Sequence, residues 1–352
     1  MTSTPTPISA SGAAIDFNRK SVLVDLHHDI AEDVIRRRQL GEQDILRRIW
    51  LRRLTNAGIK IQVFPIFIDS VFLPEMGLRR ELTMIHYLLE EFERNADDVV
   101  LARNFADIEA GLSSNKLVAV LALEGAEAID PELTILGILF RLGVRMASLT
   151  WNRRTLFADG ADKRCGGAGL TKFGADLVHK MEELGILVDV SHLSDASFWT
   201  LLEEARNPII ASHSNARALC DHPRNLTDDQ IRAIGERKGL IGVFIHPAVI
   251  DPSKPTISRV VDHIEHLIDV AGVDHVGVGT DFIKDLCGIG QTPTHEWLMP
   301  PEMAFSTISG LSESTDLPNL TDELLRRGFG SKNIQKILGE NALRVFREVW
   351  ND

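Results

Sequence analysis

Cysteine is scarce in this chain, with three residues among 352. The odd number and wide spacing of Cys165, Cys220 and Cys287 argue against a disulfide framework and favour a reducing compartment. No apolar run reaches the ~18 residues that a membrane-spanning helix needs. The first residues, MTSTPTPISASGAAIDF, have neither the basic start nor the apolar core of a secretion signal. These absences predict a cytoplasmic protein without a membrane partner.

Basic charge is also low. Lysine and arginine total 38 against 50 aspartates and glutamates, which gives a formal net charge of −12. Nucleic acid is therefore not an expected partner, because phosphate binding normally needs a concentrated basic surface. The first helical region does carry a cluster of arginines, which we interpret as a solvated or subunit-contacting helix face. These residues are Arg36, Arg37, Arg38, Arg47, Arg48, Arg52 and Arg53.

A Gly-rich nucleotide turn is missing after the first apolar run, where LHHD stands at 26–29 instead. That absence argues against a doubly wound, dinucleotide-binding sheet, which is the competing architecture. No internal repeat and no second core is evident. A chain of 352 residues with 44% hydrophobic content is then expected to form one large domain.

Eight short apolar runs, rich in Val, Ile and Leu, recur along the chain. Most are continuously apolar rather than alternating, as expected of parallel strands buried on both faces. The runs are SVLVDLHHD (21–29), KIQVFPIFI (60–68), KLVAVLALEG (116–125), GVRMASLTWN (143–152), GILVDVSHLS (185–194), PIIASHS (208–214), GLIGVFIHP (239–247) and DHVGVGTDF (274–282).

Helical patterns fill most gaps between these runs. The expected helices span residues 44–54, 170–184, 195–205, 227–237 and 257–270. Eight parallel strands alternating with helices predict an α/β fold, a (β/α)8 TIM barrel whose active site lies at the C-terminal ends of the strands.

A C-terminal extension follows the barrel. Residues 287–320 are rich in Pro, Gly, Ser and Thr and are expected to form a long loop, and 321–350 two helices packed on the barrel. We expect residues 1–20 to be a flexible leader. Residues 21–352 should then be a single domain that includes the C-terminal loop and helices (283–352).

Five metal-type ligands stand at or just beyond the ends of separate runs: His27, Asp29, Glu124, His192 and His213. Alternation along a strand would put His27 and Asp29 on one face, where the pair can chelate an ion, and turn His28 away. His192 and His213, from consecutive strands, can converge on a second ion. The two oxygens of Glu124 can bridge both ions. The pattern suggests a two-metal hydrolase.

Asp281 ends the eighth run, in GVGTDF, and allows two interpretations. It could be a sixth ligand, as in mononuclear hydrolases, or it could stand beside the metal-bound water as a proton acceptor and donor. Two divalent ions lower the pKa of a bridging water, whose hydroxide is then the nucleophile, and a separate group must carry the proton to the leaving amine. We therefore favour the second role.

Several longer segments carry a resemblance to a known family: DLHHD (25–29), LEG (123–125), SLTWNRRTLFADG (148–160), GLTKFGADLVHKMEELGILVDVSHLSDASFW (169–199), PIIASHSNARALCDHPRNLTDDQI (208–231), GVGTDF (277–282) and KILGENALRVF (336–346). They resemble the membrane dipeptidase (renal dipeptidase) family, metallopeptidases of the amidohydrolase superfamily. The resemblance spans nearly the whole chain, and the 169–231 block is highly specific. It implies a (β/α)8 barrel, a homodimer and a binuclear zinc centre. It also implies hydrolysis of dipeptides with a free N-terminus and a free C-terminal carboxylate, often with a D-residue at the second position.

Carried over residue by residue, the resemblance assigns His27 and Asp29 to the first zinc. His192 and His213 would hold the second zinc, with Glu124 as the bridge. Asp281 would be the general acid and base.

The resemblance also assigns Arg224, in HPRN, to the C-terminal carboxylate of the dipeptide, which a planar guanidinium can pair bidentately. One departure affects substrate binding: Trp151 stands in LTW where family members often have LTH. That histidine would polarise the scissile carbonyl, and such a donor can be worth about 2.7–4 kcal/mol in related chemistry. Trp151 keeps an indole N–H and the zinc can polarise the carbonyl itself, so we expect an effect on rate rather than on the kind of activity.

Two other hypotheses stay open. The first is an amidohydrolase that cleaves an N-acyl amino acid, a β-lactam or a cyclic amide, which would not require a free amine on the substrate. The second is a non-hydrolytic relative that binds a peptide-like ligand, for which Trp151 is the main support. In each case, the loops at 68–74, 126–131 and 246–252 are expected to line the pocket.

Overall fold

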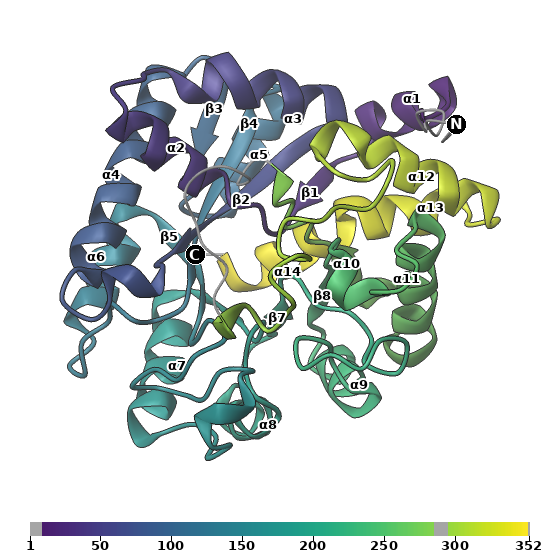
Figure 1. The fold of residues 1–352 in the computed structure, drawn as a ribbon. Helices are drawn as coiled ribbons and strands as arrows, with labels where there is room; N and C mark the ends of the chain where they lie inside the picture. Colours follow the sequence, from purple (N-terminus) through teal and green to yellow (C-terminus); the bar gives the residue numbers. More distant parts are fainter. Residues whose placement is uncertain (1–8, 285–294, 351–352) are drawn as a thin grey trace.

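Parallel strands form a nearly closed barrel at the centre of the structure (Figure 1). The strands are β1 (Leu23–Asp25), β2 (Ile59–Phe67), β3 (Val99–Leu101), β4 (Leu117–Glu124), β5 (Val144–Ser148), β6 (Leu187–Asp189), β7 (Ile210–Ala211), β8 (Leu240–Val243) and β9 (Val276–Val278). They pair in the order β1-β2-β4-β5-β6-β7-β8-β9. A hydrogen bond from Leu26 N to Val278 O, 2.9 Å long, joins the last strand to the first.

The computed structural model describes residues 9–284 and 295–350. Cys287 and the first eight residues of the expected leader lie outside the described residues. Each of the eight apolar runs contains one barrel strand, so the predicted (β/α)8 barrel is confirmed. The sequence reasoning missed β3, which pairs only with the first residues of β4. A strand of three residues is too short to show a periodic pattern.

Helices cover the outside of the barrel (Figure 1). They are α1 (Gly12–Lys20), α2 (Ile30–Gln39), α3 (Leu51–Ala57), α4 (Gly77–Arg94), α5 (Phe105–Ser113), α6 (Thr134–Leu142), α7 (Lys172–Leu184), α8 (Asp195–Glu204), α9 (Asp228–Glu236), α10 (Pro247–Ile250), α11 (Ile257–Ala271), α12 (Leu317–Arg326), α13 (Ser331–Gln335) and α14 (Asn341–Trp350). Capping residues fix the start of several helices. For example, Thr227 and Gln230 form a capping box at the start of α9. Within the described ranges, no helix combines the length and the apolar character that crossing a membrane requires.

A helix stands where we expected a flexible leader. α1 begins after Ser11, whose side chain accepts the N–H of Ala14 at 3.2 Å. Asn18 is buried and accepts a hydrogen bond of 2.6 Å from Thr321 of α12. The helix is short, and short helices depend on tertiary packing rather than on intrinsic propensity. The contact with α12 is such packing, and the local sequence does not reveal it.

The interior of the barrel is closed at one end by the last helix. Ile61, Val118 and Leu240, from the first residues of their strands, share a buried cluster with Val345 and Phe346 of α14. Apolar side chains therefore fill the end of the barrel where the strands begin. The carboxyl ends of the strands remain for polar side chains.

Candidate active site

Glu124 is the last residue of β4 and faces the barrel interior. Val118, Val120 and Ala122 precede it at every second position in the inward-facing cluster, and the two-residue period of a strand gives the carboxylate the same direction. Gly125 follows with a φ of 107°, a left-handed value that glycine tolerates without steric cost. The chain can therefore turn directly after the carboxylate, which is buried in the mouth of the barrel.

His27 and Asp29 both reach the site, although not for the reason the sequence suggested. Val24 and Leu26 are the inward-facing residues at the end of the strand. Strict alternation would therefore have turned His28 inward and His27 outward. β1 ends before this segment, and the turn that follows re-aims the side chains.

His28 points away from the site, as predicted. Its ring lies edge-on to Trp50 and Phe282, with centroid separations of 5.1 and 5.8 Å. Its Nδ1 lies 3.4 Å from Ser314 Oγ. His28 therefore packs between the barrel and the C-terminal extension.

His192 and His213 follow β6 and β7, which are neighbours in the barrel. His192 has a φ of 69°, a left-handed conformation that costs a non-glycine residue roughly 1–2 kcal/mol. Its main-chain oxygen accepts hydrogen bonds from Ala161 N at 2.7 Å and Thr150 Oγ1 at 3.3 Å. These tertiary contacts hold the backbone in the conformation that directs the imidazole inward.

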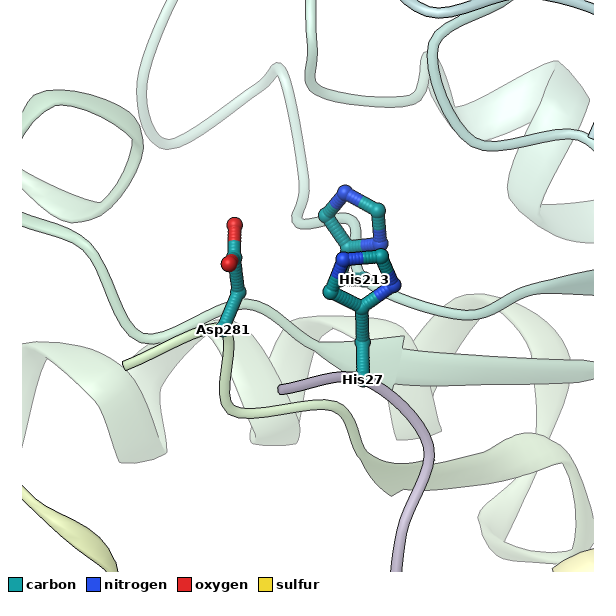
Figure 2. A group of neighbouring side chains, drawn as sticks. All are labelled: His27, His213 and Asp281. Carbon is teal, nitrogen blue, oxygen red and sulfur yellow. The ribbon is translucent and has the colours of Figure 1, made fainter. Parts of the chain in front are cut away.

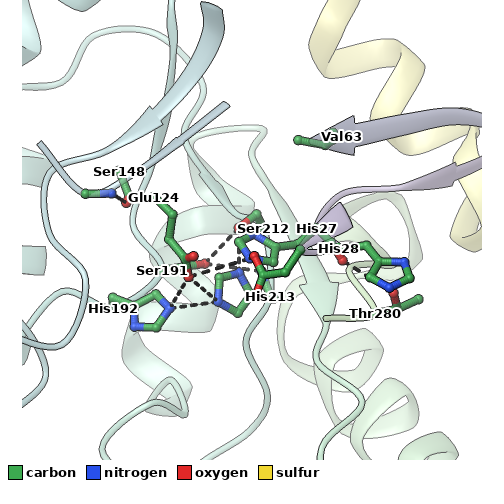
Figure 3. Close-up of polar contacts among 12 residues, drawn as sticks. His27, His28, Val63, Glu124, Ser148, Ser191, His192, Ser212, His213 and Thr280 are labelled. Atoms are coloured by element: carbon green, nitrogen blue, oxygen red, sulfur yellow. Dashed lines mark hydrogen bonds and ion pairs between the residues drawn. The ribbon is translucent and has the colours of Figure 1, made fainter. Parts of the chain in front are cut away.

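Glu124 Oε1 is the common neighbour of the three histidines. It lies 2.9 Å from His192 Nε2 and 3.7 Å from His213 Nε2. It is 3.5 Å from His27 Nε2, which in turn lies 3.8 Å from Asp29 Oδ1. Figure 3 shows the imidazoles around the carboxylate. Two groups of possible ligands share Glu124, one with His27 and Asp29 and one with His192 and His213.

Asp281 follows β9 and stands opposite the rings of His27 and His213 (Figure 2). The three residues form a further group with ligand atoms within 4.8 Å of one another. Asp281 also has a left-handed φ, 46°, and its N–H donates to His27 O at 2.8 Å. Burial raises the pKa of Asp281 to about 7. A carboxyl group with that pKa can both accept and release a proton near neutral pH.

Buried polar atoms at the centre of the site have no hydrogen-bond partner among the described residues. They are His27 Nε2, Asp29 Oδ1 and Asp281 Oδ1. Burial, followed by repulsion among the carboxylates, raises the pKa of Asp29 and Glu124 well above the usual range. Burial lowers the pKa of all three histidines. Closely spaced buried carboxylates are costly without a cation, and neutral imidazoles are metal ligands, so these residues fit a divalent metal centre.

A second layer of side chains orients the imidazoles. Asn152 Oδ1 lies 2.7 Å from His192 Nδ1, and Ser212 Oγ lies 2.8 Å from His213 Nδ1. Ser212 in turn hydrogen-bonds Asp189 through its side chain and its N–H. A partner on Nδ1 leaves Nε2 for the metal, as is usual for ligating histidines.

Asp25 ties the ends of β1 and β9 together beneath the site. Its carboxylate accepts hydrogen bonds from Thr280 N at 2.9 Å, Thr280 Oγ1 at 2.8 Å and His27 N at 3.3 Å. Burial raises its pKa to about 6. Neither Asp25 nor the second-layer residue Asn152 was predicted from the sequence. Only their places next to His27 and Trp151 along the chain could have indicated them.

Arg224 lies on the pocket wall and is buried. Its Nη2 donates to His213 O at 3.1 Å, and its N–H donates to His222 Nδ1 at 3.2 Å. Its Cζ is 5.9 Å from the centre of the Phe244 ring. Burial lowers the pKa of Arg224 to about 10, so the guanidinium keeps its charge at neutral pH.

A small pocket of about 60 Å³ opens above the site. Trp151 lines it, beside the candidate ligands. Of the three loops expected to line it, only 246–252 contributes, through His246, and the expectation for 68–74 and 126–131 was wrong. The strand ends themselves, Phe67 and Glu124, form that part of the wall. Trp297, from the C-terminal extension, was not predicted, because no local pattern shows where that segment returns.

Comparison with known proteins shows relatives along most of the chain. The family model "Membrane dipeptidase (Peptidase family M19)" matches residues 13–351. Dipeptidase tcpJ of Claviceps purpurea is 31% identical over 318 residues, which cover 87% of this chain and 70% of that protein. Dipeptidase 3 of Rattus norvegicus is 34% identical over 243 residues, 67% of this chain and 46% of that protein. An uncharacterised protein in the pqqA 5′ region of Klebsiella pneumoniae is 34% identical over 260 residues, 71% and 89% of the two chains.

Solved structures share the fold. The dipeptidase AC, a metallopeptidase of family M19, superposes with a TM-score of 0.81 at 25% identity, over 94% of this chain and 99% of that one. A metallopeptidase from Rhodobacter sphaeroides, solved with a phosphinate mimic of the dipeptide L-Ala-D-Ala, gives a TM-score of 0.82 at 24% identity. That alignment covers 94% of this chain and all of the other.

Proposed function

This chain belongs to the membrane dipeptidase family, peptidase family M19, and from that premise we propose that it is a binuclear zinc dipeptidase. The observation that carries the proposal is the pair of ligand groups that share Glu124, in a pocket that the buried guanidinium of Arg224 also lines. The ligand groups can hold two ions, and the guanidinium can hold a substrate carboxylate.

The ligands divide between two ions. His27 and Asp29 would hold the first zinc, and His192 and His213 the second, with Glu124 common to both. Three imidazoles and two carboxylates are a ligand set that suits zinc. Neutral histidines, favoured here by burial, have a free lone pair for the metal.

Two bound zinc ions would lower the pKa of a water between them and polarise the scissile carbonyl. The chain's own residues then move the proton. Asp281 stands beside the centre, and its Oδ1 has no hydrogen-bond partner among the described residues. It would accept a proton from the attacking water and deliver it to the leaving amine.

Arg224 would pair with the C-terminal carboxylate of the dipeptide. Its guanidinium is buried and, among the described residues, makes one hydrogen bond, to His213 O, so donors remain for a ligand. Dipeptides with a D-residue at the second position belong to the proposed substrate range. The Rhodobacter sphaeroides metallopeptidase, which has a similar fold, was solved with a mimic of such a dipeptide.

The test is a dipeptide screen on zinc-loaded protein, with L- and D-residues at both positions and with N-acetylated and C-amidated versions of the best substrate. We expect cleavage of free dipeptides and weak cleavage of both blocked forms. Equal cleavage of the N-acetylated form would favour an N-acyl amino acid amidohydrolase. No turnover of any compound, with metal bound, would overturn the proposed function.

A further inference from the structure

Aromatic side chains gather on one side of the pocket. The ring of Trp151 lies 5.0 Å from that of Phe67 and meets the Trp297 ring edge-on at 6.3 Å, measured between centroids. The Trp151 ring is also 5.9 Å from the His192 ring. All four residues line the pocket. We call Phe67, Trp151 and Trp297 the aromatic wall.

The arginine beside this wall already has partners. Arg153 lies over it, with its Cζ 5.2 Å from the centre of the Trp151 ring. Its guanidinium is occupied, because Nε lies 2.9 Å from a carboxylate oxygen of Glu127 and Nη1 donates to Ser70 at 2.9 Å. The wall therefore presents apolar ring surface to a ligand, and the cation beside it is already paired.

Phe67 of the aromatic wall and Arg224 follow strands on opposite sides of the barrel. Phe67 ends β2, and the segment after β7 leads to Arg224. In the strand order of the eight-stranded barrel, β2 and β7 are four positions apart. Glu124 and His192 come from strands between them and line the same pocket. A dipeptide whose carboxylate pairs with Arg224 and whose scissile carbonyl lies over Glu124 then directs its N-terminal residue toward the wall.

We propose that the aromatic wall is the subsite for the side chain of the N-terminal residue, and that it selects dipeptides whose first residue is aromatic or large and apolar. This inference rests on the proposed dipeptidase function. Ring surfaces favour aromatic and aliphatic groups through burial of apolar area and offset or edge-to-face stacking. Trp151 accordingly has a role in specificity.

Wild-type protein loaded with zinc should be assayed with a series Xaa-Ala, where Xaa is Gly, Ala, Leu, Phe, Asp or Lys, and with the reversed series Ala-Xaa. We expect kcat/KM for Phe-Ala and Leu-Ala to exceed that for Gly-Ala by about 10- to 100-fold, the range that a hydrophobic pocket supplies. Asp-Ala and Lys-Ala should be poor substrates. If no dipeptide is cleaved, the proposed function fails. If dipeptides are cleaved with equal kcat/KM across the first position, or if only the reversed series discriminates, the subsite assignment fails and the dipeptidase stands.

Variants at the wall separate specificity from general damage. Trp151→His and Phe67→Ala should each reduce the Phe-Ala to Gly-Ala ratio of kcat/KM at least about 5-fold, since both remove apolar ring surface. The readout is the ratio and not the absolute rate, because both residues line the substrate pocket and either change also affects Gly-Ala cleavage. Trp199→Ala is the matched control: Trp199 is 39% exposed on α8 and does not line the pocket. An unchanged ratio in both wall variants, with zinc content and melting temperature intact, would overturn the proposal.

Discussion

Asn152 Oδ1 lies 2.7 Å from His192 Nδ1, while Asn152 Nδ2 donates to the main-chain oxygen of Glu296 at 2.9 Å. The amide therefore presents its oxygen to the imidazole, which places the ring proton on Nδ1 and the free lone pair on Nε2. One side chain thus orients a candidate metal ligand and fastens a segment of the C-terminal extension over the pocket.

Replacing this amide should weaken one metal position. Asn152→Ala removes the acceptor for His192 Nδ1–H, so we expect zinc affinity at the His192 and His213 position to fall about 10- to 100-fold. Asn152→Asp keeps an acceptor oxygen for His192, loses the donation to Glu296 and adds a negative charge that attracts cations, so it should retain both metals. Competition with a chromophoric chelator measures both affinities. Equal zinc affinity in wild type and Asn152→Ala would contradict the orienting role.

Metal content should be two divalent ions per chain. The two ligand groups share Glu124, and a bridging carboxylate holds ions about 3.5–4 Å apart. His192→Ala should reduce the zinc stoichiometry to one, and Glu124→Ala should weaken both positions. His246→Ala is the control, because His246 lines the pocket but belongs to none of the described ligand groups. Elemental analysis after zinc loading checks this, and a wild-type value of one would exclude the bridging arrangement.

Asp281 should be needed for turnover and not for metal retention. Asp281→Asn keeps the size of the side chain and removes its ability to accept a proton, so we expect a loss of roughly 10²–10⁴-fold in kcat. Zinc content should equal that of the wild type. Asp281 lies within ligand distance of His27 and His213. Loss of zinc from this variant would therefore contradict the prediction and show that Asp281 is a metal ligand.

Arg224→Met should damage the cleavage of dipeptides far more than the cleavage of their C-terminal amides, because only the free dipeptide offers a carboxylate. Truncating one partner of a buried charge pair costs about 2–5 kcal/mol, so the loss in kcat/KM should be large. Arg217→Met is the matched control, since Arg217 pairs with Asp195 at 2.7 Å away from the pocket lining. Equal losses on both substrates in Arg224→Met would remove Arg224 from the carboxylate site.

Glu81 should make stability depend on pH. The residue is fully buried on α4, neither oxygen has a hydrogen-bond partner among the described residues, and burial raises its pKa from 4.5 to about 8. Below about pH 4.5 the group is protonated in both the folded and the unfolded state. Between pH 4.5 and 8 only the folded state binds the proton, so the free energy of unfolding falls as pH rises through this window.

The glutamine in Glu81→Gln cannot ionise, so this variant should not lose stability as the pH rises. Its free energy of unfolding relative to wild type should therefore rise from pH 4.5 to 8, by at most on the order of 4 kcal/mol. Denaturant unfolding across this range measures the difference. Glu93→Gln, on the exposed face of the same helix, should show no such trend. A pH-independent difference for Glu81→Gln would show that the carboxyl is ionised in the folded protein.

Patterns along the chain were sufficient for the barrel. The eight apolar runs each became a strand, because a parallel strand covered on both faces needs continuous apolar sequence, and that requirement is local. Glu124 was equally accessible, since it is the charged residue that ends the apolar run at 117–123. The identity of the candidate ligands followed from residue types at strand ends.

The tertiary structure alone decided the rest. The turn after β1 sets which of His27 and His28 faces the site, against the alternation of the strand. Left-handed backbone at His192 and Asp281 is held by hydrogen bonds from distant segments. The aromatic wall joins Phe67, Trp151 and Trp297, which are far apart in sequence. Burial of apolar strands leaves a periodic signal in neighbouring residues, whereas these features depend on contacts between segments that no local pattern encodes.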